Sequence, residues 1–307
     1  MRRLITPILA GVFAVCAIWS PSGLAQSSTF ARIAAWNQQG VRFTTGGEVV
    51  PISKPDQLRI AIAAINPDVI ALSEVNSPAS MDQIVATPFS NGATYKVDMD
   101  PNQSTPQQIA VLFKDSPDIS ITNRRAIPDS DDGNPGLRKA YAFDGKIRNF
   151  DFILIAVHLK SGRGATERKT RTRQVKAIAR FIREETLSGA EKDVLVMGDY
   201  NMIPGQDAVN FSNLSPGSAS NEFLRFISSS LSGASHIGTC INASQFNGNL
   251  LDGFAISRAH TNEWTGYIRI QQLQALLPSM WCDKYKSTFS DHLPIVARFR
   301  VSSPDDD

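Results

Sequence analysis

Short apolar runs divide the chain into segments with strand-like and helix-like patterns. Apolar runs bounded by turn residues are typical of strands, whereas apolar residues spaced by three and four are typical of helices. The expected strands lie at 32–36, 68–72, 95–97, 109–113, 119–121, 138–143, 147–157, 194–197, 250–256 and 295–301. The expected helices lie at 56–66 and 166–187, with shorter ones at 222–227 and 270–277. This mixture predicts an α/β protein.

The order of these segments predicts how the strands pair. The helix at 56–66 connects strands 32–36 and 68–72, which predicts a right-handed parallel crossover. The strands between residues 93 and 143 are short and broken by prolines, a pattern typical of antiparallel pairing.

Three further features refine the expected sheets. Asp144-Gly145 predicts a hairpin turn between the strands on either side of it. The run 153–157 is apolar throughout, which predicts a central strand buried on both faces. Alternation over 295–301 predicts a half-buried last strand. With no repeat or linker in the pattern, we expect one domain from residue 26 to 301, with two sheets and helices on their outer faces.

Both ends of the chain differ from this pattern. Residues 1–25 have a basic start, a short apolar run and small residues at the end, which predicts a secretory signal peptide and export to the periplasm or the outside. An uncleaved anchor is the alternative. No later segment is apolar enough to cross a membrane, and 302–307 is an acidic tail that we expect to be disordered.

Composition adds charge and cysteine count to this picture. Without Arg2 and Arg3 of the leader, 29 of the 31 basic residues remain against 29 acidic ones. A neutral total argues against tight coating of nucleic acid but does not exclude a local basic patch. Cys240 and Cys282 are the cysteines left outside the leader, and in an exported protein an even pair suggests a disulfide. Two buried thiols are the alternative.

Candidate chemistry appears where apolar strands stop. Gly198 follows a buried run and is flanked by Met197 and Asp199, with Asn201 two residues further on. Carboxylate and amide oxygens are hard ligands of the kind that Mg²⁺ or Ca²⁺ prefers. The same residues also favour turns. Similar polar residues end or interrupt the other strands, namely Asn37, Glu74, His158, Asp252, Asp291 and His292.

In their order, these stretches resemble the motifs of the endonuclease/exonuclease/phosphatase superfamily, the deoxyribonuclease I-like fold, and a secreted bacterial-type member of it. The resemblance rests on Ala35-Trp36-Asn37, Leu72-Ser73-Glu74-Val75, Val157-His158-Leu159, Gly198-Asp199-Tyr200-Asn201, Leu251-Asp252-Gly253-Phe254 and Ser290-Asp291-His292-Leu293-Pro294. It implies a four-layer α/β sandwich with two stacked mixed sheets flanked by helices. It also implies Mg²⁺-dependent cleavage of a phosphoester, with Mn²⁺ or Ca²⁺ as alternative metals.

The resemblance implies a role for each matching residue. Asn37 and Glu74 would hold the metal, with Asp291 close to it. Asp252 would hold the tautomer of His292, which would act as a base toward water or stabilise the transition state. Asp199 and Asn201 would position the water or a second metal, and His158 would assist at a phosphate oxygen or the leaving group.

Each of these residues also has a purely structural alternative. Glu74 could cap the following helix, Asn37 could end a strand, His158 could be a satisfied core histidine, and Asp252 could pair with an arginine. Two positions depart from the family pattern. Arg138, the implied phosphate contact, is followed by Lys139 rather than by proline. Gln107 and Gln108 lie where nucleases of this fold can have a carboxylate that pairs with the histidine corresponding to His158.

A basic run follows His158 directly. Its seven members are Lys160, Arg163, Arg168, Lys169, Arg171, Arg173 and Lys176, against one acid, Glu167. Lys160 and Arg163 are therefore candidate phosphate contacts, and a solvated helix face is the alternative.

The favoured substrate is DNA or RNA, cleaved by a nuclease that acts as a monomer. A phosphatase or phosphodiesterase of small phosphoesters comes second. A sphingomyelinase-like phospholipid hydrolase comes third, because it calls for an exposed aromatic hairpin. Trp264, Tyr267 and Trp281 are the nearest candidates for it, and the favoured alternative is that they belong to the core. A non-catalytic module or a toxin subunit are the remaining alternatives.

Overall fold

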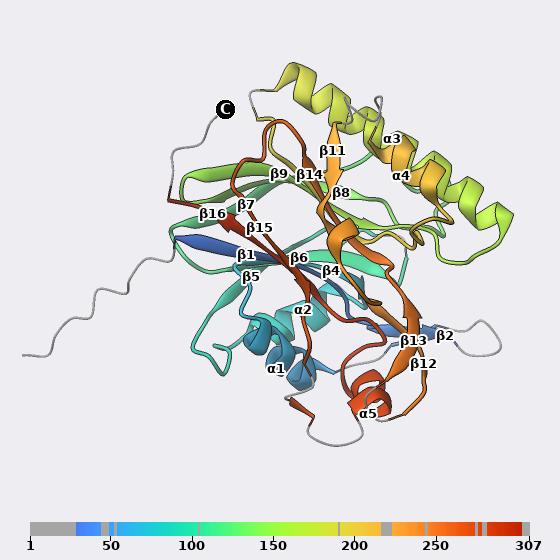
Figure 1. Ribbon diagram of the computed structural model, residues 1–307. Helices are drawn as coiled ribbons and strands as arrows, with labels where there is room; N and C mark the ends of the chain where they lie inside the picture. The colour runs from blue at the N-terminus through green and yellow to red at the C-terminus, as the bar shows by residue number, and fades with distance from the viewer. Residues whose placement is uncertain are drawn as a thin grey trace, which may run out of the picture.

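The computed structural model describes residues 29–302, apart from 44–48, 52–53, 104, 190, 216–222, 243–244, 274–275 and 278–280. The expected signal peptide and nearly all of the acidic tail lie outside the described residues. The described part is built on two six-stranded mixed β-sheets (Figure 1).

The first sheet has the strand order β15-β16-β1-β4-β6-β5. Its strands are β1 (Phe30–Asn37), β4 (Val69–Val75), β5 (Tyr95–Met99), β6 (Gln108–Lys114), β15 (Trp264–Ile270) and β16 (Ile295–Arg300). β1 and β4 are parallel, as the crossover through the intervening helix predicts, and the other neighbours are antiparallel.

The second sheet has the order β11-β14-β10-β9-β8-β7. Its strands are β7 (Ile119–Ala126), β8 (Tyr141–Ile147), β9 (Phe150–His158), β10 (Val194–Asp199), β11 (Leu224–Phe226) and β14 (Asp252–Ser257). Here β9 and β10 are the parallel pair. Two separate hairpins, β2–β3 (Val41–Phe43, Val49–Pro51) and β12–β13 (His236–Cys240, Phe246–Asn249), complete the strands of the described residues.

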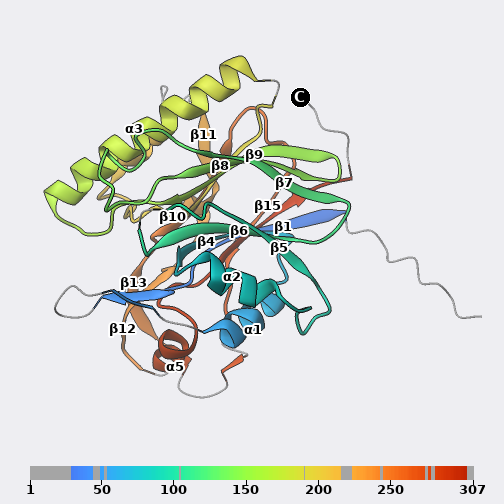
Figure 2. The ribbon, with the colours of Figure 1, turned by 180° about the vertical axis from the view of Figure 1, so that it is seen from behind.

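The helices cover the outer faces of both sheets. α1 (Pro55–Ile65) and α2 (Pro78–Val85) lie below the first sheet, whereas α3 (Ala165–Ser188) and α4 (Ala208–Leu214) lie above the second (Figures 1 and 2). α5 (Trp281–Thr288) lies beside β12, and a short 3-10 helix covers Ile227–Ser230.

Three apolar clusters fill the spaces between these layers. One lies between the sheets, where Phe143 and Phe152 meet Phe299 and its neighbours. The second lies between the first sheet and α1, and the third between the second sheet and α3. Helix, sheet, sheet and helix therefore form a four-layer α/β sandwich, and the expected fold class is confirmed.

The expected hairpin turn at Asp144-Gly145 is wrong. Both residues lie inside β8, where Gly145 pairs with Phe152 of β9. A Cβ atom on Gly145 would lie 2.3 Å from the Phe152 ring, so the glycine makes room for that ring rather than for a turn. The chain turns later, next to Arg148, whose φ is +57°.

Two expected short helices are also wrong. In the segment 222–227, residues Leu224–Phe226 form the edge strand β11, and residue 222 lies outside the described residues. In the segment 270–277, Ile270 ends β15 and 271–273 have no regular structure. Residues 274–275 lie outside the described residues, and Leu276 belongs to a single 3-10 turn, in which its N–H donates to the Leu273 carbonyl oxygen at 3.0 Å. The sequence pattern did not predict helices α4 and α5, which have eight residues or fewer. A helix of one or two turns is too short to show a clear helical spacing of apolar residues.

The last strand is more buried than expected. Ile295, Val296 and Ala297 are all fully buried. Val296 belongs to the outer cluster with Tyr285 of α5, whereas Ile295 faces the space between the sheets. This outer cluster covers Val296, whereas Arg298 on the same face is half-buried and Arg300 is exposed, so the expected alternation holds only toward the end of the strand.

Candidate active site

The topology brings one set of strand ends together. Parallel strands β1, β4, β9 and β10 end at the same edge, and the antiparallel strands β6, β8, β14 and β16 begin there. The hairpins β2–β3 and β12–β13 lie on this side, to the right in Figure 1. Asn37, His158 and Asp199 are the last residues of β1, β9 and β10, and Asp252 is the first of β14.

The local backbone conformation orients the side chains at these strand ends. Gly198 has a φ of +139°, and a Cβ atom there would lie 2.1 Å from the carbonyl oxygen of Val157 on β9. The glycine therefore lets β10 run against β9 just before Asp199. Glu74 lies within β4 rather than beyond it, at a register shift and with a φ of +56°. This bulge turns the side chain toward the edge.

An amide joins the two central carboxylates. Asn37 Nδ2 donates to Glu74 Oε1 and to Asp199 Oδ2, both at 3.1 Å. Asp199 Oδ1 in turn accepts the backbone N–H of Asn201 at 2.9 Å, so the turn alternative for this stretch is also realised. The helix that follows Glu74 is capped by Ser77, so Glu74 is not its cap.

The two carboxylates lie in an environment that disfavours their charge. Burial raises the pKa of Asp199 to about 7 and raises the pKa of Glu74 above its ordinary value. A bound cation would offset both charges.

His292 lies between two acids. Its Nδ1 lies 2.7 Å from Asp252 Oδ2, and its Nε2 lies 4.0 Å from Asp199 Oδ2. Burial lowers the pKa of His292, but the charge of Asp252 outweighs that effect and the pKa rises to about 10. Asp252 thus pairs with the histidine and not with an arginine. The carbonyl oxygen of His292 accepts hydrogen bonds from Trp36 Nε1 and Tyr285 Oη, which fix its backbone.

His158 is buried on the same edge. Its Nε2 lies 3.7 Å from both Glu74 Oε1 and Asp199 Oδ2. Its Nδ1 is buried and has no hydrogen-bond partner among the described residues, so it is not a satisfied core histidine. Burial lowers its pKa well below the ordinary value, and the nearby charge of Arg138 adds to that effect.

Arg138 and Asn201 converge on one carbonyl group. Arg138 Nη2 donates to the Leu159 carbonyl oxygen at 2.8 Å, and Asn201 Nδ2 donates to the same oxygen at 3.2 Å. Arg138 Nη1 donates to Gln107 Oε1 at 3.2 Å, so this glutamine pairs with the arginine and not with His158. These bonds hold the loop after β9 against the site.

The rim of the site carries groups that sequence reasoning did not single out. His236, the first residue of β12, forms an isolated β-bridge with His292. Its Nε2 lies 4.0 Å from Asp291 Oδ2. Lys54 also lies near Asp291, whose charge opposes the lowering of the lysine pKa by burial. A lone histidine in a Ser- and Gly-rich stretch carries no local pattern, and only the pairing of β12 with the His292 segment brings it here.

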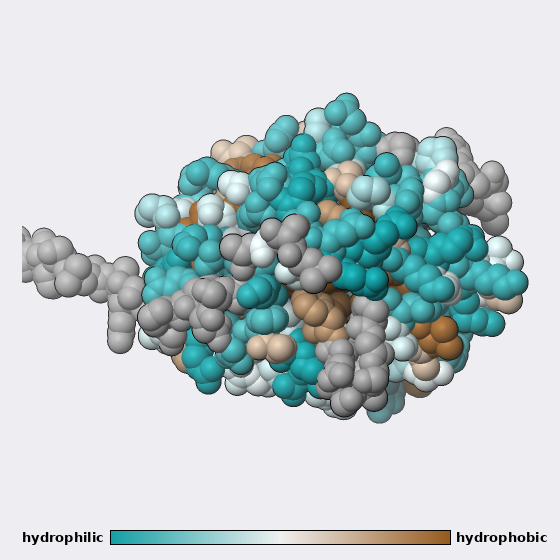
Figure 3. Space-filling view, turned by 90° about the horizontal axis from the view of Figure 1, so that it is seen from above, coloured by the Kyte–Doolittle hydropathy of each residue, from teal (hydrophilic) through white to brown (hydrophobic). Residues whose placement is uncertain are grey.

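The basic run does not form one surface. Lys160 Nζ donates to the carbonyl oxygen of Ser161, and Arg163 is exposed. Arg171, by contrast, is fully buried against Asp207 at 2.9 Å. Arg173 is paired with Asp132 on the surface. The α3 face seen from above is largely hydrophilic (Figure 3). The solvated-face alternative therefore holds for much of this helix.

The donor set suits a hard cation that keeps some of its water. The described residues contain no group of three or more His, Cys, Asp or Glu arranged to enclose a metal. Mg²⁺ is usually held by only one or two carboxylates together with substrate phosphates. Glu74 and Asp199, with the Asn37 amide between them, fit that pattern.

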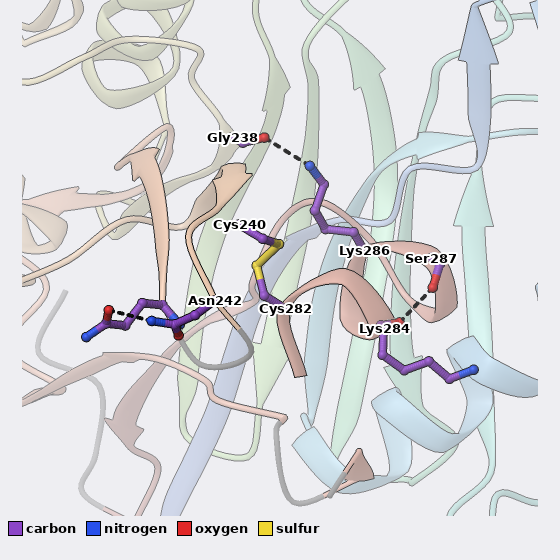
Figure 4. The surroundings of a disulfide bond; sticks show 8 residues. Gly238, Cys240, Asn242, Cys282, Lys284, Lys286 and Ser287 are labelled. Carbon is purple, nitrogen blue, oxygen red and sulfur yellow. Dashed lines mark hydrogen bonds between the residues drawn. A yellow bond between two sulfur atoms is a disulfide. The ribbon is translucent and has the colours of Figure 1, made fainter. Parts of the chain in front are cut away.

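The disulfide between Cys240 and Cys282 is confirmed. It joins the end of β12 to α5, and Lys286 Nζ donates to the Gly238 carbonyl oxygen across the same contact at 3.0 Å (Figure 4). The hairpin that carries His236 is thereby tied to α5.

Comparison with known proteins agrees with this arrangement. The chain belongs to the endonuclease/exonuclease/phosphatase family, whose family model matches residues 34–292. Members of this family are hydrolases of phosphoester bonds and typically depend on a divalent metal. No curated protein sequence matches the chain.

Solved structures share the fold at low sequence identity. Truncated TDP2 from Caenorhabditis elegans is 17% identical, with a TM-score of 0.58 over 88% of this chain and 97% of that one. The 3′-5′ exonuclease NExo from Neisseria meningitidis is 16% identical, with a TM-score of 0.60 over 88% and 99%. D. rerio TDP2 in complex with a single-strand DNA product is 14% identical, with a TM-score of 0.58 over 89% and 100%.

Proposed function

We propose that the protein is a Mg²⁺-dependent phosphodiester hydrolase that cleaves DNA or RNA. The observation that carries the proposal is the position of His292, held by Asp252 at Nδ1 and facing Asp199 at Nε2. A histidine fixed at one nitrogen by a carboxylate presents the other to a reacting group, as proton transfer requires.

The remaining roles follow from the contacts of each side chain. Asn37, Glu74 and Asp199 would hold the cation, with Asp291 at the rim near it. A bound cation would offset negative charge on the phosphoryl oxygens. Asn201 and Asp199 would orient the attacking water.

Both histidines would act on the phosphate group of the substrate. Because its pKa is about 10, His292 is charged at neutral pH and would donate a hydrogen bond to a phosphoryl oxygen. Only its deprotonated form would take the proton from that water. His158, neutral because it is buried, would donate from Nε2 to another oxygen or to the leaving group. Positioned proton transfer of this kind contributes about 10²–10⁴-fold to a rate.

An apolar cavity beside Asp252 favours nucleic acid over small phosphoesters. It has a volume of about 560 Å³ and is lined by Tyr200, Phe211, Phe226 and Leu251, with Asp252 at its side. Aromatic and aliphatic walls suit a base, because every base has a flat apolar face. Two of the similar structures are TDP2 with single-strand DNA product and NExo with a product DNA hairpin.

A phospholipid substrate finds less support. Trp264 and Tyr267 lie half-buried on β15, with Arg225 over the Trp264 ring at 4.7 Å and Arg298 over the Tyr267 ring at 4.3 Å. Trp281 begins α5. Independently of the substrate, no helix in the described part of the chain has the length and apolarity needed to cross a bilayer.

Nicking of supercoiled plasmid tests the proposed function. We expect the purified protein to nick plasmid with Mg²⁺, to stop with chelator, and to lose the activity in His292→Ala. Exposed Asp56→Asn is the matched control and should nick as wild type. Chelator-resistant nicking, or nicking that survives His292→Ala, would contradict the mechanism.

We also propose that the chain is exported. The leader at 1–25 and a disulfide typical of oxidising compartments support export. The mass of protein produced in a bacterial secretion host should correspond to cleavage after Ala25. A mass that includes residues 1–25 would contradict export through a cleaved leader.

A further inference from the structure

His236 is a second histidine at the mouth of the site, beside the His292 that the proposed function uses. The two rings pack edge to face, with centroids 4.9 Å apart and planes 63° apart. The backbone bridge between the two residues sets this geometry, and the N–H of Ile237 donates to the Asp291 carbonyl oxygen at 2.6 Å. The imidazole of His236 is therefore held at a fixed place.

The two ring nitrogens of His236 lie in different surroundings. Nδ1 of His236 is buried and has no hydrogen-bond partner among the described residues. Because Nδ1 is enclosed, a ligand can meet a ring nitrogen only at Nε2, which is a donor when it carries the proton. Burial lowers the pKa of His236, and the nearby charge of His292 adds to that effect.

In the described part of the chain, no hydrogen bond is formed by Nε2 of His236. Nε2 lies 4.0 Å from Asp291 Oδ2, which is beyond hydrogen-bond distance. The side chain of His236 is 25% exposed, and because Nδ1 is covered, the exposure lies elsewhere on the ring. The other charged groups near the ring are Asp252 and Lys286, and Lys286 already donates to the Gly238 carbonyl oxygen.

We propose that His236 binds the substrate by donating a hydrogen bond from Nε2–H to a phosphate oxygen. This inference rests on the proposed function, because it assumes a phosphoester beside His292. A donor fixed at this position can meet an anionic oxygen of a phosphoester that lies beside His292. His236 would thus help to hold the phosphate group, while His292 does the chemistry.

Two substitutions separate substrate binding from packing. His236→Phe keeps an aromatic ring against His292 but removes the donor. His236→Gln removes the ring but can place an N–H near the position of Nε2. On a chromogenic phosphodiester, bis(p-nitrophenyl) phosphate, we expect His236→Phe to raise KM about tenfold with kcat within a few-fold of wild type. His236→Gln should stay close to wild type in both.

The opposite pattern would overturn the inference. If His236 only packs against His292, His236→Phe will resemble wild type and His236→Gln will lose kcat. Circular dichroism and unfolding midpoints should confirm that both variants are folded.

A binding experiment tests His236 without turnover. The chain has four histidines, so the ring signals of His236 can be assigned by NMR with His236→Phe as reference. Titration of the Mg²⁺-loaded protein with inorganic phosphate should shift the His236 ring signals saturably. A shift of His292 without His236 would refute the inference. If no phosphoester is cleaved at all, the proposed function fails, but this titration still decides whether His236 contacts phosphate.

Discussion

Asp252 and Asp199 lie directly opposite each other in the pairing of β14 with β10, and the ring of His292 links their carboxylates. Asp252 Oδ2 lies 2.7 Å from Nδ1 of His292, and Asp199 Oδ2 lies 4.0 Å from its Nε2. One acid is therefore committed to the histidine, and the other faces the group on which the histidine acts.

The first prediction concerns this division of roles. Asp252→Asn should lower kcat on plasmid or on bis(p-nitrophenyl) phosphate by about 10²–10⁴-fold, because the amide no longer stabilises the charged ring or selects its tautomer. The unfolding midpoint in urea should change little by comparison. Asp56→Asn, on the exposed face of α1, serves as the matched control. Wild-type kcat in folded Asp252→Asn would remove His292 from the mechanism.

The second prediction concerns the glycine before Asp199. In Gly198→Ala the new methyl group would meet the Val157 carbonyl oxygen of β9, and the residue would keep a φ that alanine avoids. We expect a loss of about 3 kcal/mol or more in the free energy of unfolding. Gly92→Ala is the control, because its φ is +80° but nothing lies within 4 Å of its Cβ position. It should lose only about 1–2 kcal/mol. Equal losses in urea melts would show that the contact with β9 is unimportant.

The glycines also show how much of the structure could be predicted from the sequence alone. The strand ends at Asn37, His158 and Asp199 could be predicted because apolar runs stop there and the family motifs mark them. The role of Gly145 could not be predicted from the sequence. An Asp-Gly pair can form a turn, or its glycine can leave room for a ring such as Phe152 on the neighbouring strand, and the sequence is the same in both cases. That distinction depends on register, which local pattern does not contain.

His236 shows a second limit of sequence reasoning. Its approach to His292 depends on the pairing of β12 with residues about 56 positions away in the chain, at a bridge outside the main sheets. Lys54 reaches Asp291 in the same long-range way. Residues of this kind become candidates only when the fold is known, whereas those at strand ends are visible beforehand.

The third prediction concerns the disulfide. It closes a loop between residues 42 positions apart, so Cys240→Ala/Cys282→Ala should lower the free energy of unfolding by about 4 kcal/mol on the chain-entropy model. The bond ties β12, which carries His236, to α5. Reductant should shift the urea midpoint of the wild type and leave the double variant unchanged. A wild type insensitive to full reduction would contradict a stabilising role.

The fourth prediction concerns alkaline pH. Burial raises the pKa of four of the five tyrosines, namely Tyr95, Tyr141, Tyr200 and Tyr285. The stability that they contribute is fully present below their ordinary pKa of about 10 and is lost as pH rises above it, because the unfolded chain releases these protons first. Absorbance of tyrosinate should therefore rise together with the loss of circular dichroism. Ionisation of all four in a protein that is still folded near pH 10 would contradict this coupling.

The last prediction concerns a pair of arginines on α3. Arg171 is fully buried, and its guanidinium donates to Asp207 Oδ1 and to the carbonyl oxygens of Lys160 and Gly162, each at 2.8–2.9 Å. It thereby anchors the loop that follows His158. Arg171→Met should lower the free energy of unfolding by about 3 kcal/mol, because Asp207 remains buried without its partner.

Arg173→Met is the matched control, since Arg173 lies on the surface of the same helix in an ion pair with Asp132. Surface pairs of this kind contribute little, so its urea midpoint should stay near wild type. If the Lys160 segment helps to place the substrate, Arg171→Met should also raise KM for plasmid, and Arg173→Met should not. Equal effects of the two substitutions on the midpoint would show that burial of Arg171 does not stabilise the fold. A KM unchanged in folded Arg171→Met would instead exclude the anchored loop from substrate binding.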